Sequence, residues 1–201
     1  MEALRRCKDA LTARGFAVTC FPTAKEASDY LNKAIDQTTV GFGGSMTLKE
    51  MGLFESLSSH NEVAFHWASG SLSAEEARKK ASEAEVYLLS LNALAESGEL
   101  VNIDGACNRV ASSVYGHKRV YFVVGKNKLA PDLESAIHRA RNVAAPKNAR
   151  RLGRKTPCAI NADRCYDCRS PERICRNLSV LYAPSMGVNM EIVLIDEELG
   201  Y

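Results

Sequence analysis

Val86-Tyr87-Leu88-Leu89-Ser90-Leu91 is the stretch that decides the fold class, because it is apolar at every position except Ser90. A run of this kind is typical of a strand that is buried on both faces, as in a parallel sheet covered by helices. Residues 120–124 form a second run of the same character. The sequence therefore predicts a sheet whose central strands lie between layers of helix.

The segments on either side of these runs extend the pattern. Helices and strands are expected to alternate through residue 144, which argues for an α/β fold with a mostly parallel sheet flanked by helices. A short helical turn is expected at residues 92–96, and an irregular basic stretch is expected from residue 145 onward. Further strands are expected at residues 16–21, 39–42, 63–67, 98–105, 178–182 and 191–195, and helices at residues 2–14, 23–36, 47–57, 73–82, 108–115 and 131–144.

The bulk properties fit one domain with a small addition. The chain has 201 residues, of which 46% are hydrophobic. It has no apolar run long enough to span a membrane, and its first residues form an amphipathic pattern without an apolar signal core. We therefore expect a cytoplasmic protein that does not enter a membrane. We expect an α/β domain made of residues 1–145 and 178–201, with a basic four-cysteine insertion at 146–177.

The charge is concentrated in one segment. The chain has a net charge of +2, but residues 139–176 hold eleven Lys and Arg against three acidic residues. The first 138 residues are net acidic. The basic segment contains one aromatic residue, Tyr166, so it lacks the stacking surface that single-stranded nucleic acid requires. An anionic metabolite, a metal centre or an acidic partner fits this charge better than nucleic acid does.

Four of the seven cysteines, Cys158, Cys165, Cys168 and Cys175, lie within 18 residues. Two residues separate the inner pair, and six separate each inner cysteine from its outer neighbour. Four thiolates suit either a tetrahedral zinc ion or an iron–sulfur cluster. Single cysteines on both sides of one Cys-x-x-Cys favour iron–sulfur over zinc, and free thiols or disulfides without metal remain a third interpretation. The other three cysteines, Cys7, Cys20 and Cys107, are scattered and are expected to be small buried side chains.

A glycine-rich turn, Gly43-Gly44-Ser45, follows the expected strand at 39–42 and precedes a helix. Glycines let the backbone approach a ligand, and free N–H groups at a helix start attract an anion. Hydroxyl groups of Ser45 or Thr47 would add hydrogen bonds to that anion. The alternative interpretation is a tight turn in which Ser45 caps the helix and no ligand binds. The turn lacks the pattern of a Walker loop or a dinucleotide-binding loop.

A second polar cluster comprises Asn92, Asp104, Asn108 and Arg109. Asn92 follows the buried strand at 86–91, at the carboxyl edge where α/β proteins bind ligands. Arg109 would hold a carboxylate or phosphate in bidentate fashion. The alternative is that Asp104 only caps the following helix. The candidate ligand-binding residues are thus Gly43, Gly44, Ser45, Thr47, Asn92, Asp104, Asn108 and Arg109.

Residues 41–53 (GFGGSMTLKEMGL) and 92–105 (NALAESGELVNIDG), followed by Asn108-Arg109, resemble the signature of the lactate-utilisation (LUD) domain family. Residues 120–128 (VYFVVGKNK) and 144–152 complete the match, which covers nearly the whole chain. The spacing of the four cysteines is similar to that of a cysteine-containing subgroup of the family. The resemblance implies a fold like that of ribose-phosphate isomerases and CoA-transferases, with a pocket near the glycine turn. The carboxylate and lysine that the isomerases use have no assigned match here, so no catalytic residue is predicted.

Two functions are compatible with these features. The resemblance favours a component of a redox system for lactate or a similar small hydroxy acid, with a [4Fe–4S] cluster on the four cysteines and redox proteins as partners. The alternative is a non-redox enzyme or binding protein for an anionic metabolite, with a structural zinc. The substrate, the electron acceptor and the oligomeric state, including a homo-oligomer, remain open from sequence alone.

Overall fold

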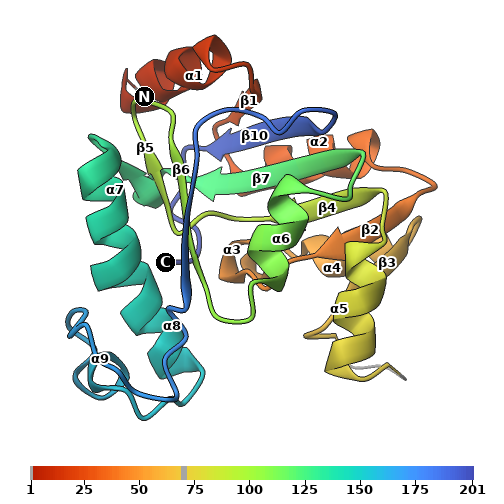
Figure 1. The fold of residues 1–201 in the computed structure, drawn as a ribbon. Coiled ribbons are helices and arrows are strands. Elements are labelled where there is room, and N and C mark those ends of the chain that lie inside the picture. Colours follow the sequence, from red (N-terminus) through yellow and green to blue (C-terminus); the bar gives the residue numbers. More distant parts are fainter. Residues whose placement is uncertain (1, 69–71) are drawn as a thin grey trace.

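A computed structural model describes residues 2–68 and 72–201 of the chain. Two sheets and their covering helices make up the molecule (Figure 1). The helices are α1 Glu2–Ala13, α2 Ala24–Ala34, α3 Met46–Glu50, α4 Leu53–Ser58, α5 Ala74–Ser82, α6 Asn108–Val114, α7 Leu133–Arg139, α8 Ala145–Arg151 and α9 Pro157–Asn161. The strands are β1 Ala17–Phe21, β2 Thr39–Phe42, β3 Glu62–Phe65, β4 Val86–Leu89, β5 Ala93–Ala95, β6 Leu100–Asp104, β7 Arg119–Gly125, β8 Leu129–Ala130, β9 Asn177–Leu181 and β10 Asn189–Ile195.

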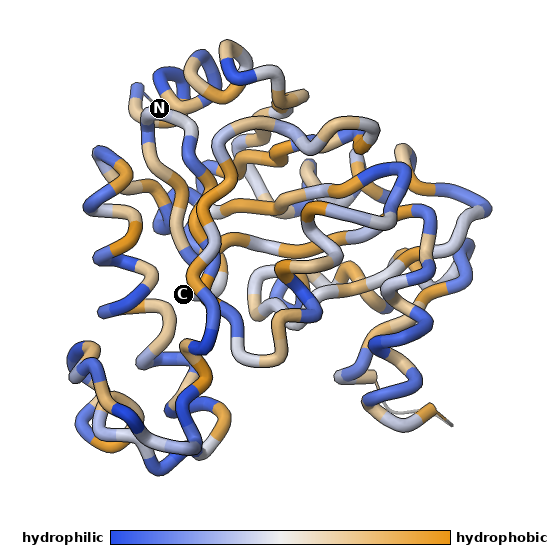
Figure 2. Tube along the Cα trace, viewed as in Figure 1, coloured by the Kyte–Doolittle hydropathy of each residue, from blue (hydrophilic) through white to orange (hydrophobic). Residues whose placement is uncertain are grey.

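The larger sheet confirms the predicted fold class. Its six strands are all parallel and lie in the order β1-β10-β7-β4-β2-β3. Strands β4, β7 and β10 are apolar along almost their whole length, because both faces of the sheet are covered. Along β7, Val120, Phe122 and Val124 face one core, and Tyr121 and Val123 face the other. Figure 2 shows these strands as an apolar interior beneath more hydrophilic helices.

The second sheet was not expected as a separate sheet, although its strands β6 and β9 lie where strands were expected, at 98–105 and 178–182. It has the order β8-β5-β6-β9, with β6 antiparallel to both of its neighbours. One face packs on the large sheet through Leu94 and Leu100, and the other packs against α7 and α8. The helical turn expected at 92–96 is wrong, because residues 93–95 are fully buried and pair with β6 and β8 as strand β5. Pairing within the fold overrides the weak local preference.

The helix expected to end at residue 144 instead continues to Arg151. Residues 140–144 form a π-helical turn, in which the Ala145 N–H donates to the carbonyl oxygen of Ala140. Pro146 has no N–H, and the wider turn just before it lets the chain pass the proline without breaking the helix. The segment that carries the cysteines therefore begins after Arg151 and lasts until β9, and it is irregular except for the short helix α9. In Figure 1 it extends beyond the end of α8, away from both sheets.

Two smaller expectations also change. The helix expected at 47–57 is divided into α3 and α4 at Gly52, whose φ of +62° lies in the left-handed region. Cys7 is fully buried as expected, whereas Cys20 is exposed and Cys107 is half-buried. Within the described residues, no helix has both the length and the apolar character needed to cross a membrane.

Gly41 in β2 provides a test of how tightly helix α5 packs on the large sheet. A Cβ here would overlap the carbonyl oxygen of Ala81 and would lie 2.8 Å from Cδ2 of Tyr87. We expect Gly41→Ala to lower the free energy of unfolding by about 2–3 kcal/mol, as measured by urea denaturation. Gly52→Ala is the control, because its added methyl meets nothing within 4 Å and only the positive φ costs about 1 kcal/mol. Equal losses in the two variants would contradict this packing.

Candidate functional site

A cavity of about 550 Å³ lies at the carboxyl edge of the large sheet, where the second sheet approaches it. Ser90 follows β4, Ile103 lies near the end of β6, and Lys128 follows β7; all three line the cavity. This is the edge at which the sequence predicted ligand binding. Of the predicted ligand-binding residues, six line the cavity: Gly44, Ser45, Asn92, Asp104, Asn108 and Arg109. Gly43 and Thr47 lie directly behind this lining.

The glycine turn supports the cavity wall through close packing. A Cβ at Gly43 would lie 2.9 Å from Cγ of Arg109, and a Cβ at Gly44 would lie 2.8 Å from Cζ2 of Trp67. Ser45 caps the five-residue helix α3, because its hydroxyl oxygen accepts from the Leu48 N–H at 3.3 Å. The glycines are therefore required for packing, and the Ser45 hydroxyl has the capping role that sequence analysis kept as the alternative.

Arg109 connects the two sheets at the cavity. Its two terminal nitrogens donate to the backbone oxygens of Ser90 and Ile103 and to the side-chain oxygens of Asn92 and Asn102, at 2.6–3.2 Å. All four terminal N–H groups are therefore satisfied within the protein. The bidentate anion contact predicted for Arg109 would require an exchange of these bonds. In the structure, the guanidinium instead fixes the shape of the cavity and contributes positive charge to it.

Asp104 serves as a helix cap. One carboxylate oxygen accepts from the N–H of Cys107 and the other from the N–H of Val110, each at 3.1 Å. The carboxylate also lies 3.8 Å from Nε of Arg109. Its negative charge is thus already compensated by two N–H groups and a guanidinium. Asn108, at the start of α6, lines the cavity beside it.

Lys128 is the residue that sequence analysis missed. Its side chain lines the cavity but is almost fully buried, and its amine donates to Oγ1 of Thr47 at 2.7 Å and to Oγ of Ser90 at 2.8 Å. No carboxylate in the described part of the chain forms an ion pair with it. A sequence signal did exist, because Lys128 follows a buried strand just as Asn92 does. In the sequence of residues 120–128, however, nothing indicates that Lys128 and not Lys126 would be buried at the site.

The electrostatic environment of Lys128 favours a neutral amine. The pKa of Lys128 is lowered to about 7, mainly by burial and additionally by the positive charges of Arg139 and Arg109, while the charge of Glu50 opposes the shift. Arg139 is held nearby through hydrogen bonds to the backbone oxygens of Asn127 and Asn92. A buried amine that is half neutral near pH 7 can accept a proton or act as a nucleophile.

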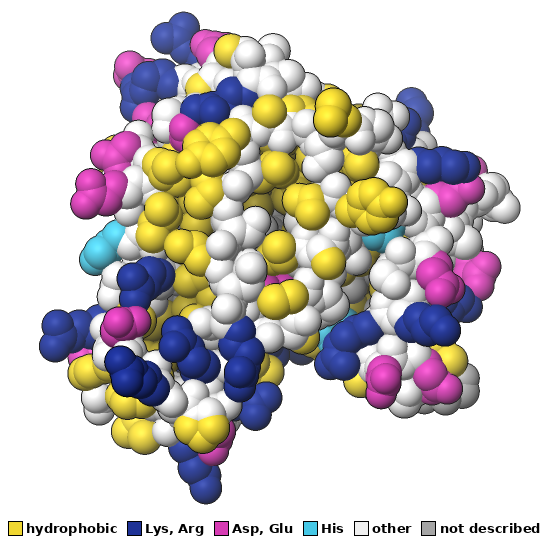
Figure 3. All heavy atoms as spheres, in the orientation of Figure 1, with side chains coloured by type: hydrophobic (Ala, Val, Ile, Leu, Met, Phe, Trp, Pro, Cys, Tyr) yellow, Lys and Arg dark blue, Asp and Glu magenta, His cyan; other side chains and the backbone are white. Residues whose placement is uncertain are grey.

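Five arginines from other parts of the chain line the outer cavity: Arg78, Arg151, Arg154, Arg173 and Arg176. All except Arg78 belong to the end of α8 or to the cysteine segment, so this segment forms one wall of the cavity. Figure 3 shows Lys and Arg side chains on both sides of the notch at the lower edge of the molecule. Arg151 also lies 4.6 Å from the ring centre of Trp67. We conclude that the cavity is suited to an anion.

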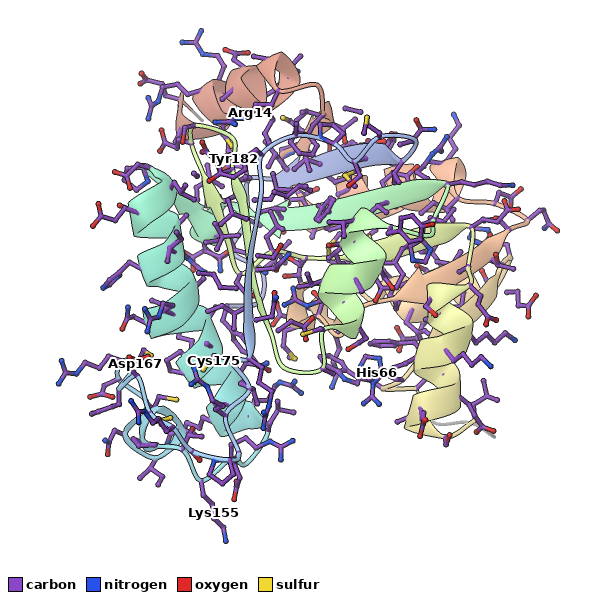
Figure 4. All side chains as sticks on the ribbon, in the orientation of Figure 1. Arg14, His66, Lys155, Asp167, Cys175 and Tyr182 are labelled. Atoms are coloured by element: carbon purple, nitrogen blue, oxygen red, sulfur yellow. The ribbon has the colours of Figure 1, made fainter. Side chains whose placement is uncertain are left out.

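Three buried polar atoms on this lining have no hydrogen-bond partner among the described residues: Nδ1 of His66, Nε of Arg173 and the hydroxyl of Tyr201. Burial lowers the pKa of His66, and the charge of Arg78 lowers it further. In Figure 4, His66 lies on the side of α5, and Cys175 lies across from it in the segment after α8. Unsatisfied groups of this kind are costly unless a ligand or water meets them.

The four cysteines of the predicted metal site do not form one in this structure. Cys158, Cys165, Cys168 and Cys175 are all half-buried. Among residues 2–68 and 72–201, no three His, Cys, Asp or Glu side chains come together in a group that could hold a metal ion. The sulfur of Cys175 accepts from Arg173 at 3.3 Å, and that of Cys165 accepts from the N–H of Asp167 at 3.3 Å. The sequence pattern suits a cluster, but the present positions of these thiols do not.

The fold and the cavity together define an α/β protein with a cavity rich in basic side chains at the carboxyl edge of a parallel sheet. The chain belongs to the LUD domain family, whose model matches residues 4–195. It is accordingly a protein related to lactate utilisation. Its structure is similar to the crystal structure of a DUF162 family protein from Deinococcus radiodurans, with a TM-score of 0.56, 14% identity and 96% of each chain covered. This likeness supports the fold, and a comparison with curated proteins gave no match.

The buried amine of Lys128 leads to a prediction about stability and pH. Its pKa is about 7 in the folded chain and has the ordinary value of 10.5 when unfolded. Between these values the unfolded chain holds the proton and the folded chain does not, so stability increases as pH rises. At 1.36 kcal/mol per pKa unit, the gain is on the order of 5 kcal/mol at most.

Urea unfolding of the wild type and of Lys128→Met, measured from about pH 7 to about pH 10, isolates this contribution. The free energy of unfolding should rise more steeply with pH in the wild type than in the variant. Parallel curves would show that Lys128 titrates normally in the folded chain.

Proposed function

We propose that the cavity binds lactate or a similar small hydroxy acid by its carboxylate, as one step of a redox system. One observation carries this proposal: the cavity wall holds seven basic side chains and only two acidic ones, Asp104 and Glu172. Asp104 is engaged in capping α6, and Glu172 accepts from the N–H of Lys155 at 2.9 Å. Membership of the LUD family supports a small hydroxy acid as the anion.

The redox part of the proposal rests on the cysteine segment. Removing two electrons from a hydroxy acid requires an acceptor, and the four cysteines are the candidate site for one, with [4Fe–4S] preferred to zinc. Arg141 and Arg173 contact the sulfurs of Cys165 and Cys175, and cations in this position favour the thiolate form that binds metal. Because no three of these thiols come together, a cluster would require rearrangement of residues 157–175.

One feature of the cavity favours the second candidate, a non-redox protein for a larger anionic metabolite with a structural zinc. The outer wall carries Arg151, Arg154, Arg173 and Arg176 in addition to the basic side chains further in. One carboxylate does not need this many cations, whereas a phosphorylated compound would use more of them. Comparison of lactate with a sugar phosphate therefore separates the two candidates.

Binding can be tested by isothermal titration with lactate, pyruvate and a sugar phosphate. We expect Kd for the favoured acid to rise about tenfold in Arg173→Gln, a loss of about 1.4 kcal/mol, because the buried Nε of Arg173 has no partner among the described residues. Arg169→Gln is the matched control, since Arg169 is exposed on the same segment and does not line the cavity. Tight binding of the sugar phosphate alone would favour the second candidate. Absence of binding by all three anions would refute both.

Metal content tests the cysteine site separately. Protein purified without oxygen is expected to contain about four iron and about four sulfide per chain and to be coloured. Cys168→Ser should lose the iron, whereas Cys20→Ser should keep it, because Cys20 is exposed on β1 and lies outside the segment. A colourless protein with one zinc would contradict the iron–sulfur proposal and support a structural metal.

A further inference from the structure

We propose that Lys128 forms a covalent imine with the carbonyl carbon of a small 2-oxo acid bound in the cavity. The inference rests on the proposed function, because a 2-oxo acid is the oxidised counterpart of a 2-hydroxy acid and has the same carboxylate. It adds a covalent reaction and a reacting atom to that function.

The position of the amine is unusual for a lysine with a purely structural role. Lys128 is 3% exposed, and buried lysines are normally paired with a carboxylate. Here the described partners of the amine are two neutral hydroxyls, those of Thr47 and Ser90. The side chain nevertheless lines the cavity, so a bound molecule can reach it. Burial without a counter-ion favours an uncharged amine, which is the nucleophilic form.

The two hydroxyls also orient the amine. The Thr47 hydroxyl donates to the carbonyl oxygen of Leu199 at 3.1 Å, so its oxygen is left to accept a hydrogen from Lys128. Ser90 supplies the second acceptor, at 2.8 Å. A neutral amine has two N–H groups and one lone pair. With both N–H groups directed to hydroxyls, the lone pair is the part of the nitrogen left for an electrophile.

Nearby charges select the kind of carbonyl compound. Arg109 and Arg139 lower the pKa of Lys128 through their positive charge, so they lie close enough to attract an anion to the same place. Glu50 is the acidic group that opposes them. A carboxylate directly attached to the carbonyl carbon would place negative charge beside the amine. This arrangement suits a 2-oxo acid better than a neutral aldehyde or ketone.

Imine formation requires no oxidant or reductant. The Lys128 nitrogen bonds to the carbonyl carbon, and the carbon–oxygen double bond opens to a carbinolamine. The two amine hydrogens then leave with the carbonyl oxygen as one water molecule, which gives the imine. Hydrolysis reverses each step. The oxo acid is thereby held covalently, and its neighbouring carbon becomes more acidic because the protonated imine accepts electrons.

The experiment uses pyruvate as the probe and sodium cyanoborohydride to reduce any imine to a stable amine. Intact-mass spectrometry of the full chain should show one reduced pyruvate adduct, and peptide mapping should place it on Lys128. At pH 7.5 we expect labelling of Lys128 to be roughly tenfold or more faster than labelling of any other lysine, because ordinary lysines have a pKa near 10.4. The rate should reach half its maximum near pH 7.

Variants provide matched controls. Lys128→Met should lose the adduct, whereas Lys126→Met should keep it, because Lys126 is two residues away and pairs with Asp196 at the surface. If Lys128→Met fails to fold, the peptide map of the wild type still decides the question. Adducts only on exposed lysines would overturn the proposal. If pyruvate stabilised the protein against heat without forming an adduct, the imine proposal would be overturned, but the proposed function would stand. If pyruvate produced no stabilisation and no adduct, both the imine proposal and the proposed function would be overturned.

Discussion

The cavity depends on the hydrogen bonds that Arg109 makes between the two sheets. Its guanidinium bonds to Ser90 after β4, to Asn92 before β5, and to Asn102 and Ile103 in β6. These bonds hold the second sheet against the carboxyl edge of the first and leave a space between them. Gly43 is required beside the arginine, because any side chain there would meet its Cγ. The buried cation thus defines the geometry of the site and contributes to its positive potential.

Much of the large sheet could be predicted from sequence because its strands carry a strong local signal. Apolar runs at 86–91 and 120–124 are long enough to be strands and too short to be covered helices. In the second sheet, β6 and β9 lie where strands were expected, but β5 has no such signal. Residues 93–95 (ALA) are compatible with a helix or a strand, and only pairing with β6 and β8 decides between them. The continuation of the helix past Pro146 was also not predictable, because a proline normally indicates the end of a helix. Here the π turn at 140–144 accommodates the missing N–H of Pro146.

The residues of the candidate site were also only partly predictable from sequence. Residues at the carboxyl edge, such as Asn92 and Arg109, could be found because they follow recognisable strands. Their hydrogen-bond partners could not be predicted. Arg109 was expected to bind an anion, but in the structure its guanidinium bonds to groups of the protein. Lys128 was missed because its significance lies in burial without a counter-ion, which is a property of the folded chain. The arginines of the cysteine segment were recognised as a basic cluster, but their place on the cavity wall follows from the path of the chain after α8.

The way the cysteine segment returns to the domain has a consequence for evolution. The Arg176 N–H donates to the carbonyl oxygen of Asp104, Asn177 pairs with Asp104 in the sheet, and a Cβ on Gly105 would lie 3.0 Å from the carbonyl oxygen of Ile174. The segment is therefore joined to the residues that cap α6 and line the cavity. Substitutions at 174–177 and at 104–105 must be compatible with each other, so these positions should change together as relatives diverge.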